Sequence, residues 1–320
     1  MKAIVKKSLA TDAPLALVEL PAPVPRANEV RVAIKAAGVN PADWKMLASG
    51  AASLAGRTLN PSGQVFAGMD FSGIIDATGT NVTRFKVGDP VAGATRVFMG
   101  QGGSWADTVV LPQSQVCPLP EGFDLVAAGA LPVPGVTAWM AVVRIGRLKR
   151  GQKALILGAS GGVGHLALQV AKHVCGAFTV GVCSARNIQL VQSLGADVAI
   201  DYGKGDALEQ AQPHGPYQVV VDCVGDYSAV RCHELLTPQG RHVNIAAQSA
   251  SAIAQMLVPP FRTRTLLGLP TPATLRPVIE AVASDRIKVI VSERIPLSHA
   301  EKAVALSQSG RVVGKIVLVP

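Results

Sequence analysis

A glycine-rich run places the strongest constraint on what this chain can fold into. Gly158, Gly161 and Gly164 directly follow the apolar stretch 154–157, and from residue 163 to 174 apolar residues recur at the spacing of a helix. A strand, a glycine-rich turn and a helix in this order are typical of a βαβ unit that binds the pyrophosphate of a dinucleotide. Glycine allows the tight turn, the close approach of the backbone to phosphate, and close packing of the helix on the sheet.

The turn itself supplies most of the predicted contacts to a pyrophosphate. Backbone N–H groups at the start of the helix face the phosphates in such units. The spacing is GxxGxxG and not the more common GxGxxG, so the glycines alone are moderate evidence. The alternative of a plain glycine-rich turn is disfavoured by the strand before the glycines and the helix after them. We expect the cofactor to contact Gly158, Ser160, Gly161, Gly162, Val163 and Gly164. His165 comes next and is predicted to lie on the helix surface.

The chain around this turn alternates short apolar strands with helical stretches. A helix is predicted over 187–194, and Gly195 is placed to cap its C-terminal end. Alternation of this kind predicts an α/β fold with a doubly wound parallel sheet covered on both faces. The predicted strands after the first are Phe178–Cys183, Val198–Ile200, Gln218–Cys223, His242–Ala246 and, as a sixth, Arg264–Leu269.

The first 120 or so residues show a different pattern, rich in strands. Alternating apolar residues predict a strand over Glu29–Ala36, and further strands are predicted over Asp70–Thr78 and Trp105–Leu111. Pro41–Leu47 is predicted to form a helical turn. The last 30 or so residues return to strand character, so we expect the C-terminal tail to join this first, β-rich domain.

The end of the second predicted strand of the parallel sheet indicates which dinucleotide is bound. Sites that prefer NAD place an acid there to bind the ribose 2′-hydroxyl, and this chain has none. Ser184 can donate to a 2′-phosphate and the guanidinium of Arg186 can pair with it, which favours NADPH. Asn187 and, after the third strand, Tyr202 are expected to reach the same end of the cofactor.

Composition narrows the remaining function classes. The net charge is +9, but the basic residues are scattered and aromatic residues are only 4% of the chain, so nucleic acid is not expected as the main partner. No apolar stretch approaches the ~20 residues of a membrane-spanning helix, although association with a membrane surface stays open. Five widely spaced cysteines without a CxxC pattern argue against a disulfide framework and against a structural zinc site. We expect a cytoplasmic protein, with a chloroplast or membrane-peripheral location as the alternative.

Motifs along the whole chain resemble one family. The sequence is similar to the zinc-free quinone oxidoreductase branch of the medium-chain dehydrogenase/reductase superfamily, which includes zeta-crystallin and plant alkenal and enone reductases. Within that branch it most resembles the plant chloroplast-envelope members. The stretches that carry the resemblance are 38–45 (GVNPADWK), 67–73, 87–91 (VGDPV), 131–138 (LPVPGVTA), 158–164, 185–202 and 314–318 (GKIVL).

The resemblance implies a split architecture. A GroES-like catalytic domain would comprise residues 1–122 and 269–320, and a Rossmann domain over 123–268 would bind NADPH. The family also suggests a homodimer, with strand pairing near Arg264–Leu269.

The resemblance also implies chemistry without a metal. Zinc-dependent relatives have a Cys where this chain has Asn40, followed here by Pro41 and Asp43, and a His-Glu pair where it has Gly68, Met69 and Asp70. Because those thiolate and imidazole ligands are missing, no zinc site is expected. Hydride transfer to a quinone or to an α,β-unsaturated carbonyl needs no metal, since the conjugated carbonyl takes the charge.

Family position assigns the remaining site residues. Asn40, Asp43 and Lys45 are expected to line the catalytic region, with Asn40 orienting the nicotinamide or the substrate oxygen and Lys45 donating to an enolate. Many relatives have a tyrosine at the position of Lys45, so the proton donor stays open and solvent is an alternative. The expected further contacts to the cofactor are Thr137, Cys223, Val224, Asn244, Ile245, Ala246 and Lys315.

The expected function is NADPH-dependent hydride transfer to a quinone or to the C=C bond of an α,β-unsaturated carbonyl, and two alternatives to it stay open. Quinone and enone reduction need the same planar conjugated acceptor, so the sequence does not separate them. An enoyl-thioester reductase is a second enzymatic possibility. A protein that binds NADPH without turnover, either crystallin-like or membrane-associated, is the alternative from another class.

Overall fold

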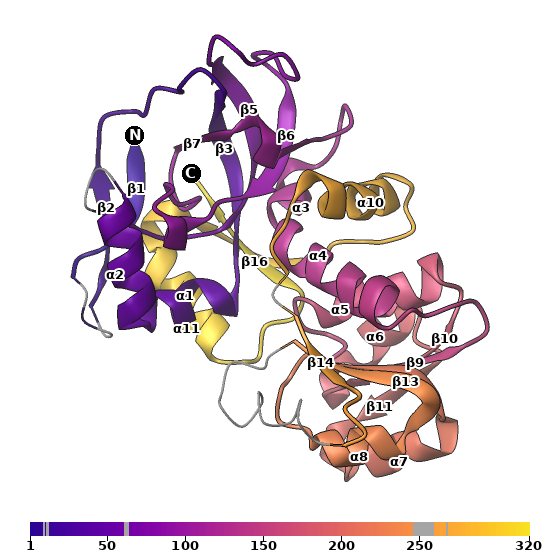
Figure 1. Ribbon diagram of the computed structural model, residues 1–320. Helices are drawn as coiled ribbons and strands as arrows, with labels where there is room; N and C mark the ends of the chain where they lie inside the picture. Colours follow the sequence, from indigo (N-terminus) through magenta and orange to yellow (C-terminus); the bar gives the residue numbers. More distant parts are fainter. Residues whose placement is uncertain (9, 11–12, 61–63, 246–258, 267) are drawn as a thin grey trace. The chain divides into compact units, whose positions relative to one another are not determined.

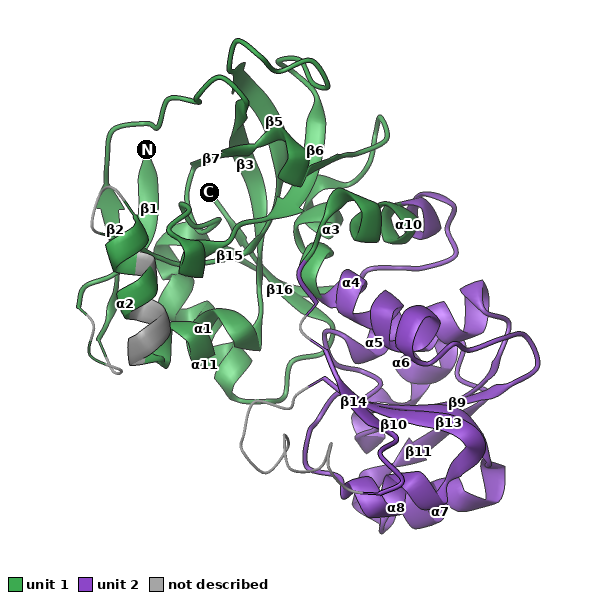
Figure 2. Ribbon diagram, in the orientation of Figure 1, with its two compact units in different colours: residues 1–133, 270–279, 291–320 green, residues 134–269, 280–290 purple. Residues whose placement is uncertain are grey.

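The computed structural model describes the chain except for residues 9, 11–12, 61–63, 246–258 and 267. It forms two compact units, each assembled from separate stretches of the chain (Figure 2). Unit 1 consists of Met1–Val133, Pro270–Ile279 and Val291–Pro320, and unit 2 consists of Pro134–Leu269 and Glu280–Ile290. The domain boundaries predicted from the sequence lie after residues 122 and 268, whereas the units change after Val133 and Leu269 and again around residues 280–290.

Unit 1 is built around a seven-stranded sheet. Strand β3 (Glu29–Val39) pairs antiparallel with β5 (Asp70–Thr78), with β7 (Thr108–Pro112) and with the C-terminal β16 (Lys315–Val319). The tail therefore joins the sheet of the N-terminal strands, as predicted. The other strands of this sheet are β6 (Pro90–Ala94), β8 (Val116–Pro118) and β15 (Val291–Pro296).

A smaller sheet and several helices complete unit 1. The sheet has the order β2 (Leu15–Glu19), β1 (Lys2–Lys6), β4 (Val65–Phe66). Helix α1 spans Pro41–Ala48, close to the predicted turn, and its start is explained by a capping box of Asn40 and Asp43 with proline at the first position. The other described helices are α2 (Gly50–Leu59), α3 (Leu125–Gly129) and α11 (Ala300–Gln308).

Unit 2 contains the predicted parallel sheet of six strands (Figure 1). Their order is β11-β10-β9-β12-β13-β14, so sequential numbering gives 3-2-1-4-5-6, the order of a Rossmann fold. The central strands are buried on both faces, which explains their continuous apolar sequences. Their bounds are β9 (Lys153–Leu157), β10 (Phe178–Cys183), β11 (Val198–Asp201), β12 (Tyr217–Asp222), β13 (Leu236–Asn244) and β14 (Thr263–Thr265).

Three strand predictions need adjustment, and one of them lies in unit 1, where β7 begins at Thr108 and not at the predicted Trp105. Strand β13 begins at Leu236, before the predicted start at His242, because its first half pairs with β12 through an irregular register. The edge strand β14 is shorter than the predicted Arg264–Leu269, since only Thr263–Thr265 pair with β13. Strand β10 has the predicted bounds.

The helices of unit 2 follow the strands. Helix α5 (Gly164–Gln169) continues as a π-helical turn over Val170–Val174, and α6 (Ile188–Ser193) ends before Gly195, whose φ of 107° suits the predicted cap. Helix α4 (Pro132–Trp139) begins in unit 1 and runs into unit 2, as does α10 (Pro272–Ala283). The short helices α7 and α8 span Ala207–Ala211 and Ala229–Glu234.

None of the described helices combines the length and the apolar composition that a membrane span requires.

Candidate active site

The glycine-rich turn of unit 2 has the backbone geometry of a phosphate cradle. Gly158 directly follows β9 with a φ of 77°, a conformation that favours glycine. A Cβ on Gly164 would lie 2.0 Å from the carbonyl oxygen of Gly158, so only glycine lets the helix approach the strand this closely. A Cβ on Gly161 would lie 3.4 Å from the same oxygen and would meet nothing closer, so the space beside Gly161 is open. Open space beside backbone N–H groups fits a bound pyrophosphate.

The carboxyl ends of neighbouring strands meet at this turn. A Cβ on Gly158 would lie 3.1 Å from Cγ2 of Val224 and 3.5 Å from Cβ of Cys223, so the first and fourth strands deliver predicted site residues to one place. The buried carboxylate of Asp222 fixes the backbone that follows β12, because its Oδ1 accepts from the N–H groups of Val224 and Gly225 at 2.9 and 2.8 Å. These contacts place Cys223 and Val224 beside the phosphate cradle.

The proposed adenosine end lies at the carboxyl ends of β10 and β11. These strands are parallel and Cys183 pairs with Asp201, so Ser184 and Tyr202 each follow a paired residue. Arg186 is exposed and Tyr202 is 57% exposed. Both side chains are therefore accessible to a ligand.

Ser160 and Asn187 meet in the structure. Both are buried, and Nδ2 of Asn187 donates to Oγ of Ser160 at 2.9 Å. This bond ties the cradle to the short helix that carries Arg186. These two residues, both predicted to contact the cofactor, thus hold together the two segments that are predicted to bind it.

The remaining residues of unit 2 that were predicted to contact the cofactor lie after β13 and in α4. Asn244 ends β13 and is buried, and the N–H of Ile245 donates to the carbonyl of Asp222 at 3.0 Å. Thr137 is buried in α4, where a Cβ on Gly268 would lie 2.4 Å from its Oγ1. Ala246 lies outside the described residues.

In unit 1, a cluster of buried polar side chains surrounds Asn40. The side-chain Nδ2 of Asn40 donates to Oδ2 of Asp70 at 2.8 Å, and its backbone N–H donates to Oδ2 of Asp43 at 2.7 Å. The ammonium of Lys315 donates to Oδ1 of Asn40 at 2.5 Å and to the carbonyl of Val39 at 2.8 Å. We call Asn40, Asp43, Asp70 and Lys315 the charged cluster.

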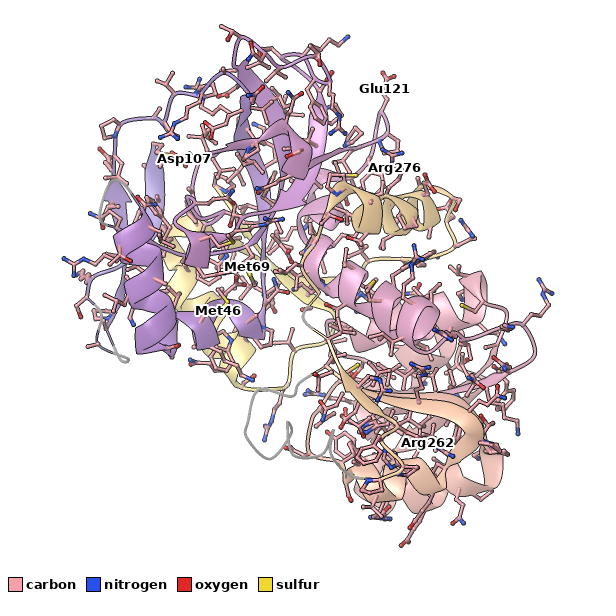
Figure 3. The ribbon with its side chains drawn as sticks, viewed as in Figure 1. Met46, Met69, Asp107, Glu121, Arg262 and Arg276 are labelled. Carbon is pink, nitrogen blue, oxygen red and sulfur yellow. The ribbon has the colours of Figure 1, made fainter. Side chains whose placement is uncertain are left out.

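The charged cluster joins elements far apart in sequence. Asp70 begins β5 directly after Met69, which Figure 3 labels, and Lys315 begins the C-terminal β16. Oδ1 of Asp70 also accepts from the N–H of Val133 at 2.8 Å, in the first turn of α4. Its carboxylate therefore caps the start of the helix that carries the chain into unit 2.

Burial shifts the titration of every ionisable member of the cluster. Burial and then the negative charge of Asp70 raise the pKa of Asp43 to about 7, although hydrogen bonds from Asn40 and the charge of Lys315 oppose the shift. Burial raises the pKa of Asp70 to about 6 against the attraction of Lys315, and burial lowers the pKa of the Lys315 ammonium. Two carboxyls and one cation thus share a site that disfavours a second negative charge.

One atom of the cluster is left without a hydrogen bond. Oδ1 of Asp43 is buried and has no hydrogen-bond partner within the described part of the chain. A buried oxygen without a hydrogen bond is costly in a protein core, and a catalytic role is one explanation for such an atom.

Lys45 does not belong to the charged cluster. It is exposed on α1, and its Nζ lies 5.5 Å from the centroid of the Trp44 ring. Trp44 in turn donates from Nε1 to Oγ of Ser307 at 3.0 Å. The structure therefore brings together Asn40, Asp43 and Lys315 of the predicted residues, and separates Lys45 from them.

Sequence reasoning missed two acids and misplaced one histidine. Asp70 and Asp222 are fully buried. In the sequence each acid interrupts an apolar stretch at the end of a strand, and this pattern could have indicated a buried functional carboxylate. The prediction that His165 lies on the helix surface is wrong, since the side chain is 0% exposed. The helix is enclosed on the side that carries His165 because residues 288–290 cover it.

The described side chains do not form a cluster of metal ligands. Among the residues that the structure describes, no three or more His, Cys, Asp or Glu side chains are grouped to hold a metal ion. In the charged cluster the carbonyl oxygen of Asn40 already accepts from the ammonium of Lys315.

Two family models match the chain. Residues 26–121 match the alcohol dehydrogenase GroES-like domain, and residues 194–318 match the model described as zinc-binding dehydrogenase. The first match lies within unit 1.

Curated relatives cover almost the whole chain. A chloroplast envelope quinone oxidoreductase homolog of Arabidopsis thaliana is 32% identical over 313 residues, which are 95% of this chain and 93% of that protein. A human mitochondrial NAD(P)H oxidoreductase is 30% identical over 325 residues, covering 91% of this chain and 81% of its own length. Among solved structures, a quinone oxidoreductase from Coxiella burnetii is similar with a TM-score of 0.88 and 28% identity, covering 100% of this chain and 99% of that one.

Proposed function

The chain belongs to the quinone oxidoreductase branch of the medium-chain dehydrogenase/reductase superfamily, and on this premise we propose that it uses NADPH to reduce a quinone or the C=C bond of an α,β-unsaturated carbonyl without zinc. Membership makes it an oxidoreductase that uses a nicotinamide cofactor. The observation that carries the finer proposal is the charged cluster, in which a carboxyl with a raised pKa and an orphan oxygen lies beside Asn40.

The preference for NADPH is supported by the residues that follow β10 and β11. Ser184 and the exposed Arg186 can bond a 2′-phosphate, and Asp201, the acid at this edge, has Oδ1 occupied by the N–H of Gly203 at 2.9 Å. The open space beside Gly161 fits the pyrophosphate common to NADPH and NADH. Discrimination between the two cofactors is therefore assigned to Arg186.

The proposal of chemistry without zinc is supported by Lys315. Its ammonium donates to Oδ1 of Asn40 and lies close enough to Asp43 and Asp70 to oppose the rise in their pKa values. A divalent cation at these oxygens would meet this positive charge at short range and lose one acceptor. The lysine thus supplies the charge compensation that a metal would supply elsewhere.

The residues of the cluster then act on the substrate oxygen. A bound nicotinamide would supply the hydride, and negative charge would develop on the oxygen of the conjugated carbonyl. Asp43 keeps a proton up to about pH 7, and a carboxylic acid held neutral can donate a hydrogen bond to such an oxygen. Asn40 positions Asp43 through its backbone N–H, and Lys45 is the alternative donor.

An acceptor panel tests this function. Purified protein with saturating NADPH is offered quinones, 2-alkenals, enones and an enoyl-CoA thioester, and oxidation of the cofactor is scored as kcat/KM. We expect turnover with quinones or unsaturated carbonyls. Turnover confined to the thioester would instead indicate an enoyl-thioester reductase, and tight NADPH binding without any turnover would indicate a non-catalytic binding protein.

A further inference from the structure

Helix α5, which follows the phosphate cradle, buries two polar side chains completely. His165 is 0% exposed and Gln169 is 2% exposed. They are one helical turn apart, so they lie on the same face of the helix. Because buried polar groups are costly unless they are hydrogen-bonded, their partners show what this face of the helix does.

The imidazole of His165 bridges the cradle and a distant segment. Its Nδ1 lies 2.9 Å from the carbonyl oxygen of Gly161, and its Nε2 accepts from the backbone N–H of Ile290 at 3.2 Å. A backbone N–H can only donate, so Nε2 carries no proton. Nδ1 therefore carries the proton and donates to Gly161, which fixes a neutral ring in one tautomer.

The amide of Gln169 holds the same segment two residues earlier. Its Nε2 donates to the carbonyl of Lys288 at 2.9 Å, and its Oε1 accepts from the N–H of Lys288 at 2.8 Å. The side chain thus pairs with both backbone groups of one residue, as a neighbouring strand would. Nε2 also donates to the carbonyl of His165 at 2.8 Å, which links the two side chains.

The segment held in this way is a chain crossing. Residues 288–290 have no helix or strand structure, and they are the last of unit 2 before β15 begins at Val291 in unit 1. His165 and Gln169 replace the secondary-structure partners that the backbone of Lys288 and Ile290 lacks. We call the two side chains and residues 288–290 the crossing clamp.

The clamp also fixes a peptide plane in the cradle. The carbonyl of Gly161 accepts from the backbone N–H of His165 at 3.0 Å as well as from the imidazole. In a trans peptide the N–H of the next residue points opposite to the carbonyl. Holding the Gly161 oxygen toward the helix therefore turns the N–H of Gly162 away from it, the orientation that an anion at the cradle needs.

We propose that His165 and Gln169 are positioning residues for the cofactor pyrophosphate, acting through the peptide between Gly161 and Gly162. The proposal rests on the proposed binding of NADPH. It differs from a packing role, because a packing role requires neither a particular tautomer nor an effect on cofactor affinity. Since the pyrophosphate is common to both cofactors, the clamp acts equally on NADPH and NADH, unlike Arg186.

Two substitutions at His165 separate the two bonds. His165→Asn keeps a donor near the position of Nδ1 and loses the acceptor for Ile290, whereas His165→Gln reaches toward Ile290 and loses the donor to Gly161. His173→Asn is the matched control, since His173 is an exposed histidine on the continuation of the same helix and contacts the carbonyl of Leu194. Dissociation constants for NADPH and NADH are measured by fluorescence below the melting temperature of every variant, together with the KM of the acceptor at saturating NADPH.

We expect His165→Gln, which loses the donor to Gly161, to raise both dissociation constants by the same factor, about tenfold for one lost bond and its unpaired partner, with the acceptor KM unchanged. His165→Asn keeps that donor and should raise both constants by a smaller common factor. His173→Asn should leave both constants unchanged. Variants that lower the melting temperature but bind both cofactors as tightly as the wild type would overturn the proposal. If the wild type binds neither cofactor, the proposed function fails first and the clamp proposal fails with it.

A spectroscopic measurement checks the same proposal without any substitution. In protein labelled with ¹⁵N at histidine, long-range proton–nitrogen spectra report which ring nitrogen carries the proton. His165 should show the Nδ1–H tautomer, assigned by the signal missing in His165→Asn. An Nε2–H tautomer would contradict the bond to Ile290 and overturn the proposal even if cofactor affinity changes.

Discussion

The phosphate cradle of unit 2 is built from the backbone of one continuous run of residues, whereas the charged cluster of unit 1 is built from side chains that the fold collects from Asn40 to Lys315. Backbone N–H groups carry no titratable charge. The cluster, by contrast, holds two carboxyls and an ammonium that are all shifted by burial. The cluster should therefore respond to pH, the cradle should not, and the two regions should be sensitive to different kinds of substitution.

Lys315→Met breaks the cluster most severely. It removes the only cation hydrogen-bonded to Asn40 among the described residues and leaves Asp43 and Asp70 buried without compensation. We expect the free energy of unfolding at pH 8 to fall by about 3 to 5 kcal/mol, measured by urea denaturation. Lys302→Met, at an exposed position on α11, is the control. Equal losses for the two variants would show that the cluster is not charge-compensated by Lys315.

Asp43→Asn sharpens the contrast in pH response. Because burial raises the pKa of Asp43 from 3.8 to about 7, the folded protein binds more protons than the unfolded chain between these values, and stability falls as pH rises through them. The amide that replaces the carboxyl cannot ionise, and its oxygen can still accept from the backbone N–H of Asn40. We expect the difference in unfolding free energy between pH 5 and pH 8 to shrink.

The control for that measurement is Asp76→Asn, since Asp76 is an exposed acid that pairs with Arg31 at 2.8 Å. It should keep the full dependence on pH. A pH profile for Asp43→Asn that matches the wild type would mean that Asp43 is ionised in the folded protein at neutral pH.

Gly164→Ala tests the cradle through its backbone. The new Cβ would overlap the carbonyl of Gly158, so we expect a loss of about 3 kcal/mol in unfolding free energy, at the upper end for overpacked sites.

Gly161→Ala is the matched control for stability, because its Cβ meets only ordinary contact. It should fold normally yet bind NADPH at least about tenfold more weakly, or ~1.4 kcal/mol, since the methyl group enters the cradle. Unchanged affinity would remove the pyrophosphate from this position.

Arg186→Ala separates the two cofactors. Loss of a charge-assisted pair costs about 1.5 to 3 kcal/mol, so the Kd of NADPH should rise roughly 10- to 150-fold while that of NADH is nearly unchanged. Lys204→Ala, at an exposed basic residue beside Tyr202, controls for the general field of positive charge. An equal loss for NADPH and NADH would remove the 2′-phosphate from Arg186.

Lys45→Met is expected to have the smallest effect. Lys45 is exposed and lies outside the charged cluster, so kcat should stay within about twofold of the wild type, in line with ordinary surface substitutions. A much larger fall in kcat with unchanged NADPH affinity would restore Lys45 as the proton donor and weaken the case for Asp43.

The same contrast explains what the sequence could predict. The cradle depends on local order, so strand, turn and helix could be identified from spacing, and β10 was predicted with its observed bounds. Asn40 and Asp43 were found because they share one short motif with α1. Asp70 was missed as a member of the site because its partners Asn40, Val133 and Lys315 are brought to it only by the tertiary fold.

His165 shows a second limit. Its periodicity in α5 was read correctly as helical, but a pattern of apolar residues does not reveal what covers the remaining face. Residues 288–290 return to that face after more than a hundred residues of intervening chain, and they turn a predicted surface residue into a buried bridge. Burial by a distant segment without secondary structure leaves no periodic signal in the sequence.

The most direct test of the account follows deuterium from NADPH labelled at C4 into an enone product, using protein dialysed against a chelator and assayed with and without added zinc. The account predicts that an enone or a quinone oxidises NADPH at a rate that zinc does not increase, and that any reduced enone carries deuterium on its β-carbon. Activity that appears only after zinc is added, or NADPH that binds tightly but is oxidised by no acceptor, would contradict it.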